Sequence, residues 1–170
     1  MRGQGPAFEE FVLASTPTLH RTAVLLTGDP HTARDLLQEA LLKAWRSWGR
    51  VTGDRVAYVR TIVVREFLTQ RRRRWHGERP TEELPEQADT RQGADLETSL
   101  TLADAVRALP PQQRAVVVLR YFHDLTEADT ARTLGLAVGT VKSHHSRALA
   151  ALRVSEHLDD VVAGGKGRLA

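Results

Sequence analysis

The strongest constraint on the fold of this chain is a stretch that cannot fold by itself. Residues 77–95 contain two prolines, two glycines and many acidic side chains, with almost no apolar residues. A stretch of this composition buries too little apolar surface to offset the entropy that folding removes. It therefore splits the chain into two parts, each of which needs its own apolar core.

Both parts show the periodicity of amphipathic helices. Apolar residues recur three or four positions apart in long runs, and no run alternates convincingly with the two-residue period of a strand. Pro17 is expected to interrupt or restart the first run, because proline lacks the N–H that an inner helical turn uses. The pattern predicts helices over residues 7–26, 31–48, 55–75, 96–108, 111–122, 126–134 and 138–153.

These helices predict an all-α fold of two small helical domains. An N-terminal helical bundle would occupy residues 1–76, and a C-terminal four-helix domain with a helix-turn-helix would occupy residues 98–153. A flexible acidic linker, 77–97, would join them, and residues 154–170 would form a flexible tail.

The composition excludes several classes of protein. None of the 170 residues is cysteine, which excludes a disulfide scaffold, a thiol nucleophile, cysteine-ligated zinc and an iron–sulfur cluster. The longest apolar runs are too short to span a membrane, and the first 15 residues lack the apolar core of a signal peptide, so we expect a cytoplasmic protein. Adjacent residues such as His144 and His145 point about 100° apart on a helix and rarely share one ion. We predict no catalytic residue, no metal and no cofactor.

The distribution of charge indicates a nucleic-acid partner. Residues 1–77 carry a net charge of +6, residues 78–97 carry −5 and residues 98–170 carry +2. The sharpest basic feature is the third predicted helix, whose cations are Arg60, Arg65, Arg71, Arg72, Arg73 and Arg74. The helix dipole favours cations at a helix C-terminus, but four consecutive arginines exceed what that effect requires. Their density favours contacts with phosphates over a merely solvated helix end.

The spacing of three small or apolar residues near the C-terminus predicts a helix-turn-helix. Ala131 lets two helices approach, Gly135 supplies a positive φ at the turn, and Val141 anchors the second helix. This placement leaves a polar outer face of Thr140, Lys142, Ser143, His144, Ser146 and Arg147, which could enter a major groove. The alternative is a helical hairpin with a solvated polar face.

The second predicted helix carries a candidate docking face. Between residues 33 and 45 it is apolar nearly all round, while Asp35, Gln38 and Glu39 share one edge. A small module lacks the core to bury every leucine of this helix, so an exposed remainder would form a protein-docking surface. A plain core helix with solvated acids is the alternative.

Taken together, these segments resemble one protein family. The run from Leu25 to Leu41 resembles the segment that docks sigma-70-type RNA polymerase sigma factors on the polymerase clamp helices. Residues 57–64 and the following arginines resemble the helix of those factors that recognises the −10 promoter element. Residues 109–143 resemble their −35-binding domain. The matches keep the family's order over residues 7–153 and point to its extracytoplasmic-function (ECF) group, close to the actinobacterial sigma-E-like branch.

The resemblance implies an alternative sigma factor, not an enzyme, that binds core RNA polymerase and promoter DNA and aids strand opening. Clamp docking would fall to Asp35, Leu36, Gln38, Glu39 and Leu42, and a flap contact to the C-terminal domain. The six arginines of the third helix would contact the −10 region, and the outer face of the last helix would read the −35 duplex. Loop 49–56 would receive a flipped base, and the acidic linker would cross the polymerase interior. An anti-sigma factor is a further implied partner.

Four residues depart from the family pattern. Arg34 stands where Glu is usual beside the docking Asp, and Arg65 stands where Asn is common in the −10 helix. His144 replaces the usual Arg of the −35 helix, and His145 replaces an apolar residue or Thr. These departures leave the promoter sequence undetermined.

Two other functions fit the sequence less well. A stand-alone operator-binding regulator would leave the arginine-rich helix and the acidic linker unexplained. An enzyme with a helical active site has no constellation of residues to support it. Binding to core RNA polymerase separates the sigma factor from the stand-alone regulator.

Overall fold

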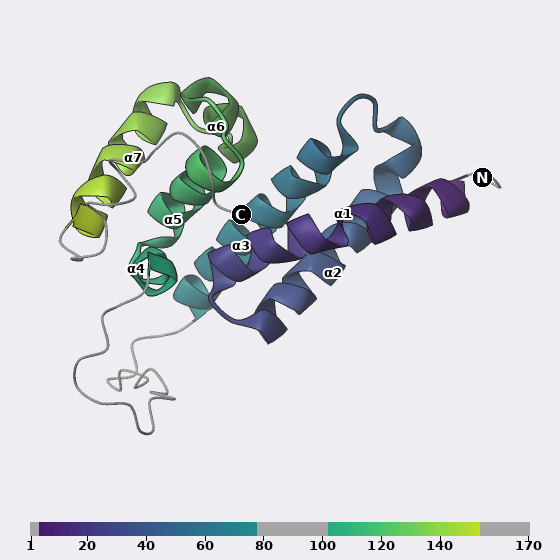
Figure 1. Cartoon of the computed structure of the whole chain (residues 1–170), viewed down its shortest axis with the longest axis horizontal. Helices are drawn as coiled ribbons and strands as arrows, with labels where there is room; N and C mark the ends of the chain where they lie inside the picture. The colour runs from purple at the N-terminus through teal and green to yellow at the C-terminus, as the bar shows by residue number, and fades with distance from the viewer. Residues whose placement is uncertain (1–3, 78–101, 154–170) are drawn as a thin grey trace.

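The computed structural model describes residues 4–77 and 102–153, without the side chains of residues 4 and 74–77. Every secondary-structure element of these two stretches is helical, which confirms the predicted all-α fold (Figure 1). The elements are α1 (Gln4–Thr27), α2 (Pro30–Ser47), η1 (Trp48–Arg50), α3 (Arg55–Gly77), α4 (Leu102–Ala108), α5 (Pro111–Val117), η2 (Val118–Phe122), α6 (Glu127–Leu134) and α7 (Val138–Arg153). The predicted linker and tail, and the start of the helix predicted over 96–108, lie outside the described residues.

Helices α1, α2 and α3 pack into the predicted N-terminal bundle. Its fully buried side chains include Leu19, Leu26, Leu36, Val59 and Val63. Gly28, with a φ of 77°, ends α1, and the Asp29 carboxylate then caps α2 by accepting from the Thr32 backbone N–H at 2.7 Å.

In the described part of the chain, no helix is long and apolar enough to cross a membrane.

The expected break at Pro17 is wrong, because α1 runs unbroken through it. Proline removes one N–H, so the Leu13 carbonyl one turn earlier loses its helical donor. Both residues are exposed, and Leu13 keeps 80 % of its surface in solvent, so water can reach that carbonyl. The aromatic rings of Phe8 and Phe11 pack on Trp48 at 4.8 and 4.7 Å between ring centroids, which ties the first half of α1 to the bundle.

Helices α4 to α7 form the C-terminal region, with buried side chains of their own at Val106, Leu109, Val141 and Leu152. The predicted helix 111–122 is confirmed in extent, but its last turn widens into the π-helical η2. There the His123 N–H donates to the Val118 carbonyl, five residues back, at 3.3 Å.

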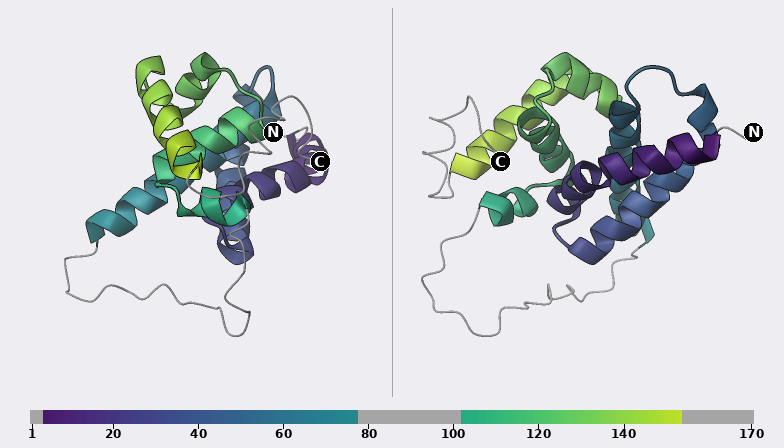
Figure 2. Two further views of the ribbon diagram at one scale, coloured as in Figure 1. Left: turned by 60° about the vertical axis from the view of Figure 1, so that its left-hand side comes forward. Right: turned by 45° about the vertical axis from the view of Figure 1, so that its right-hand side comes forward.

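The two helical regions also pack against each other, which the sequence did not predict. Ala115, Val118 and Leu119 belong to the same buried cluster as the core of the N-terminal bundle. Helix α4 contacts α1, and helix α6 contacts α3. Figure 2 shows the C-terminal helices against one end of the bundle from two further directions.

Candidate nucleic-acid interface

The helix-turn-helix has the geometry that its three marker residues predicted. Thr126 caps α6 by accepting from the Asp129 N–H at 3.1 Å, and Gly135 ends it with a φ of 67°. Ala131 and Val141 are buried between the two helices. The predicted outer face of α7 is exposed at Thr140, Lys142, Ser143, Ser146 and Arg147.

The two histidines of α7 behave differently from this exposed face. His144 is half-buried, and its Nδ1 is buried without a hydrogen-bond partner among the described residues. Burial lowers the pKa of His144, with a further contribution from the nearby Arg147 cation. A neutral His144 would contact a base edge or a phosphate as a single donor or acceptor and would not supply a positive charge.

His145 turns toward the protein and packs on Tyr121. Its Nε2 lies 2.8 Å from the Tyr121 hydroxyl, and the two rings are 5.6 Å apart. The half-buried imidazole packs inward at the position where the resembling family usually has an apolar residue or Thr. This position explains why His145 does not join the exposed face.

The arginine-rich end of α3 is exposed where its side chains are described. Arg71, Arg72 and Arg73 all lie in solvent, and the Arg71 guanidinium also sits 5.7 Å from the centre of the Phe67 ring. The side chain of Arg74 lies outside the described residues. A basic strip of this kind can attract phosphates without reading bases.

Arg60 and Arg65, which were predicted to share this role, instead face the C-terminal region. The Arg65 guanidinium donates from Nε to the Thr133 carbonyl at 2.8 Å and from Nη2 to the Arg132 carbonyl at 3.0 Å. Arg60 is half-buried and its Nη1 lies 3.5 Å from His123 Nδ1. In this arrangement the Arg65 guanidinium is engaged by the end of α6, although the side chain is exposed, and Arg60 is half-buried.

The half-buried His123 and the buried Arg114 also belong to this contact, which was not predicted from the sequence. His123 Nε2 lies 2.9 Å from the Thr22 hydroxyl, and burial lowers the pKa of His123 to about 4, helped by the Arg60 cation. The Arg114 guanidinium donates to the carbonyls of Leu26 and Leu109 at 2.5 and 3.1 Å. Local patterns did not reveal these contacts, because Thr22 and Leu26 lie about a hundred and about ninety residues away along the chain.

The candidate docking face lies on the exposed side of α2. Asp35, Gln38 and Glu39 are exposed there, and Leu42 keeps 56 % of its surface in solvent. Together with Lys43 and Arg46 they line an open hollow of about 330 Å³. Leu36 is only 1 % exposed, so its side chain belongs to the core and cannot contact a docking partner directly. Trp45, 42 % exposed and one turn from Leu42, extends the apolar surface instead.

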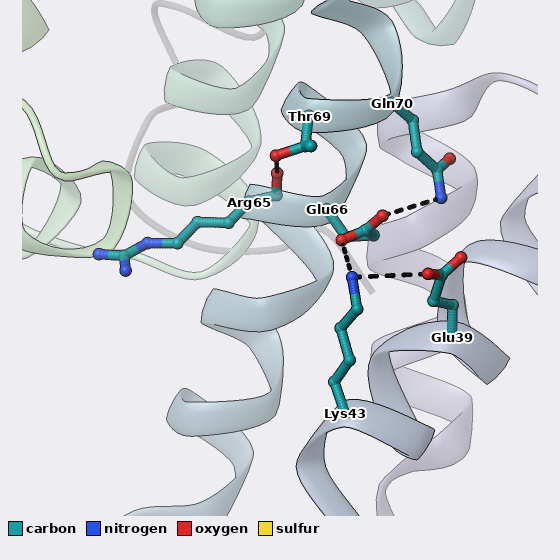
Figure 3. Close-up of polar contacts among 6 residues, drawn as sticks. All are labelled: Glu39, Lys43, Arg65, Glu66, Thr69 and Gln70. Atoms are coloured by element: carbon teal, nitrogen blue, oxygen red, sulfur yellow. Dashed lines mark hydrogen bonds and ion pairs between the residues drawn. The ribbon is translucent and has the colours of Figure 1, made fainter. Parts of the chain in front are cut away.

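An ion-pair network connects this face with α3. Lys43 Nζ pairs with the buried Glu66 carboxylate and lies 3.5 Å from Glu39, while Gln70 donates to Glu66 at 3.4 Å (Figure 3). The hydrogen bond with Glu66 raises the pKa of Lys43. Figure 3 shows Arg65, the neighbour of Glu66, pointing the opposite way, toward the C-terminal helices.

The predicted base-receiving loop 49–56 contains a second hollow. It measures about 300 Å³ and is lined by Ser47, Arg50, Val51, Thr52 and Tyr58. The Arg55 guanidinium covers the Trp48 ring at 4.6 Å and helps to fix the loop's end. Within residues 4–77 and 102–153, no three histidine, cysteine or carboxylate side chains come together as metal ligands would.

Comparison with known families gives a match on each helical region. The family model described as sigma-70 region 2 matches residues 11–77, and the one described as sigma-70 region 4 matches residues 99–152. The first match covers α2 and α3, and the second covers the helix-turn-helix.

Individual proteins give the same result over nearly the whole chain. The chain is 39 % identical to the RNA polymerase sigma-E factor of Streptomyces avermitilis, with 89 % of this chain and 86 % of that protein covered. It is 37 % identical to the ECF RNA polymerase sigma factor SigM of Mycobacterium tuberculosis, covering 88 % and 77 %. Among solved structures, it resembles the sigma factor RpoE in its complex with the anti-sigma factor NepR from Bartonella quintana. That match has a TM-score of 0.67 and 26 % identity, and it covers 90 % of this chain and 98 % of the other.

Proposed function

The chain belongs to the ECF group of the sigma-70 family of RNA polymerase sigma factors, and from this premise we propose how its parts divide the work. A sigma factor is a non-catalytic subunit that binds core RNA polymerase and directs it to specific promoters. The chemistry of transcription stays with the polymerase. What the chain must supply is a grip on the polymerase, recognition of two promoter elements, and help in opening the strands.

The observation that carries the proposal is the exposed polar face of α7. Lys142, Ser143, Ser146 and Arg147 project from a helix whose other side is fixed by Val141 and Leu152 in the core. A rigid helix with polar side chains at this spacing can enter a major groove and donate to base edges. We assign it to the −35 duplex.

The exposed side of α2 would hold the polymerase clamp. Leu42 and Trp45 offer apolar surface, and Asp35, Gln38 and Glu39 offer polar partners around it. An apolar centre with a polar rim is the common anatomy of a protein interface. Lys43 would stiffen this side by linking Glu39 to the buried Glu66.

The end of α3 and the hollow beside it would act on the −10 element. Arg71–Arg74 would hold phosphates, and the 300 Å³ hollow at Tyr58 would take one base out of the stack. Removing a base from the duplex costs a few kcal/mol, which contacts with the hollow and the backbone would offset. An anti-sigma factor remains a proposed partner, by analogy with the complexed relative.

Run-off transcription with purified core polymerase tests the function. Polymerase with this chain should produce transcripts from a defined set of promoters, whereas polymerase alone should not. Sequencing the start sites then yields both promoter elements. Binding of the chain to single operators with no effect on polymerase would contradict the proposal and favour a stand-alone regulator.

A further inference from the structure

The contact between the two helical regions is built from reciprocal caps on helix ends. Arg65 of α3 donates to the last carbonyls of α6, and Arg114 of α5 donates to the Leu26 carbonyl near the end of α1. Each arginine thus places its cation at the negative end of a helix in the other region. The two contacts cross the interface between residues 4–77 and residues 102–153 in opposite directions. We call this interface the seam.

The seam also has a polar centre and an apolar lining. His123 lies between Thr22 of α1 and Arg60 of α3, with its Nε2 at 2.9 Å from the Thr22 hydroxyl and its Nδ1 at 3.5 Å from Arg60 Nη1. Val118 and Leu119 are buried against the bundle, and Phe122, Leu125 and Leu134 pack around them. A contact with a buried apolar lining and several directed hydrogen bonds has the anatomy of a defined interface.

This arrangement cannot hold both promoter elements at once. Elements centred near −35 and −10 are about 25 base pairs apart, or about 85 Å along straight B-DNA. Arg65 touches Thr133, which lies five residues before the start of α7. From the reach of that chain and the length of α7, no part of the recognition helix lies farther than roughly 50 Å from Arg65.

We infer that the structure is a closed form of the sigma factor in which Arg65 is a latch that α6 and promoter DNA compete for. Arg65 lies on the helix assigned to the −10 element, so the same guanidinium cannot serve both partners. Asparagine, which is common at this position in the family, has a side chain too short to donate to both carbonyls at once, as the arginine guanidinium does. Opening would free Arg60 and Arg65 for DNA and separate the two reading surfaces. The claim that opening exposes DNA-binding surfaces rests on the proposed function, whereas the contact between Arg65 and α6 does not.

Distance measurement between two spin labels tests the latch directly. The chain has no cysteine, so Leu13→Cys on α1 and Ala128→Cys on α6, both at exposed positions, give one defined label pair. The otherwise native 170-residue chain should show one narrow distance distribution, that of the closed form. Arg65→Ala should raise the ratio of long to short distances about tenfold, and Arg65→Lys should fall between the two. Arg73→Ala removes the same charge from an exposed position two turns further along α3 and should leave the distribution unchanged.

Two outcomes would overturn the inference. One is an equal shift for Arg65→Ala and Arg73→Ala, which would make the effect one of net charge. The other is an unchanged short distance when the labelled native chain is in a transcriptionally active complex with core polymerase and promoter DNA. A failure of the proposed function would look different, because the unlabelled chain would then support no transcription while the Arg65 effect on the free chain persisted.

Discussion

Lys43 on α2 reaches the buried carboxylate of Glu66 on α3, and it is the described cation that neutralises this acid. Glu66 is 6 % exposed, and its other partner, Gln70, is neutral and 3.4 Å away. Removing one member of a buried ion pair leaves an uncompensated charge, which costs more than the pair contributes as a whole. The stability of the bundle should therefore depend on Lys43 more than on other surface cations.

Lys43→Met should lower the free energy of unfolding by about 2 kcal/mol, below the full value for a buried pair because water still reaches Lys43. Lys142→Met is the matched control, because Lys142 is exposed and forms a loose surface ion pair with Glu127 at 3.8 Å. This substitution should cost less than about 0.5 kcal/mol. Adding Glu66→Gln to Lys43→Met should recover part of the loss. Urea denaturation measures all three, and equal losses for the two lysine variants would contradict the argument.

The double change Gln38→Ala and Glu39→Ala should weaken binding to core polymerase at least about tenfold, because both side chains lie on the proposed clamp face. Glu9→Ala with Glu10→Ala removes two exposed acids from α1 and should leave the affinity unchanged. A fluorescence titration of labelled sigma factor with core polymerase provides the measurement. Unchanged affinity in the α2 variant would remove the docking assignment.

Acid should loosen the fold through His123. Burial lowers the pKa of His123 from its usual 6.5 to about 4, so the unfolded chain binds the proton more readily than the folded one. Its contribution to stability is complete above pH 6.5 and is lost as the pH falls from 6.5 to about 4. Because the ring is only partly buried, we expect a loss of about 1 kcal/mol between pH 7 and 5. His123→Asn should lack this part of the pH dependence in denaturation experiments, and an identical pH profile would refute the assignment.

Two glycines of the helix-turn-helix should respond to alanine with opposite signs. Gly135 has a φ of 67°, which costs a residue with a Cβ about 1–2 kcal/mol. Gly139 lies in the first turn of α7 with open space around it, where alanine favours the helix by up to about 1 kcal/mol. Thermal unfolding of Gly135→Ala and Gly139→Ala should give a lower and a higher midpoint, respectively. The same sign for both would show that the turn does not depend on the left-handed conformation.

The sequence predicted what depends on local patterns and missed what depends on the other region. Thr126, Gly135 and Val141 were assigned correctly because helix capping, a positive φ and helical spacing depend on residues that are close together in the sequence. The contact of Arg65 with α6 was not predicted, since its partners at Thr133 and Arg132 are nearly seventy residues away. Pro17 was misread for a similar reason, because the exposure of Leu13 decides whether the helix tolerates it.

The docking face shows the same division. Amphipathic spacing correctly placed Asp35, Gln38 and Glu39 on one exposed edge of α2. It could not tell Leu36 from Leu42, since both are leucines on an almost entirely apolar helix. Packing against α1 and α3 buries the first and leaves the second 56 % exposed.

The last prediction separates phosphate binding from base reading. Arg72 and Arg73 are adjacent on α3 and exposed, and side chains that fan out from a helix cannot all enter one groove. Replacing both by Ala should lower open-complex formation by a similar factor on every promoter and reduce the salt slope by about one to two. His144 and Arg147 lie on α7, where the loss of a good base contact changes the preference by about 1–3 kcal/mol. Their alanine variants should therefore alter the ranking of −35 sequences.

Transcription from a randomised promoter pool at two salt concentrations distinguishes these effects. The Arg72 and Arg73 double variant should keep the order of preferred −10 sequences, with lower activity on all of them and a weaker dependence of that activity on salt. A re-ranking of −10 sequences by this variant would mean that the cluster reads bases. An unchanged −35 ranking with both α7 variants would mean that the recognition face lies elsewhere on the helix. Arg65→Ala adds a third pattern. If the latch and the −10 contact share this guanidinium, this one substitution should both lengthen the label distances in the free chain and change the ranking of −10 sequences.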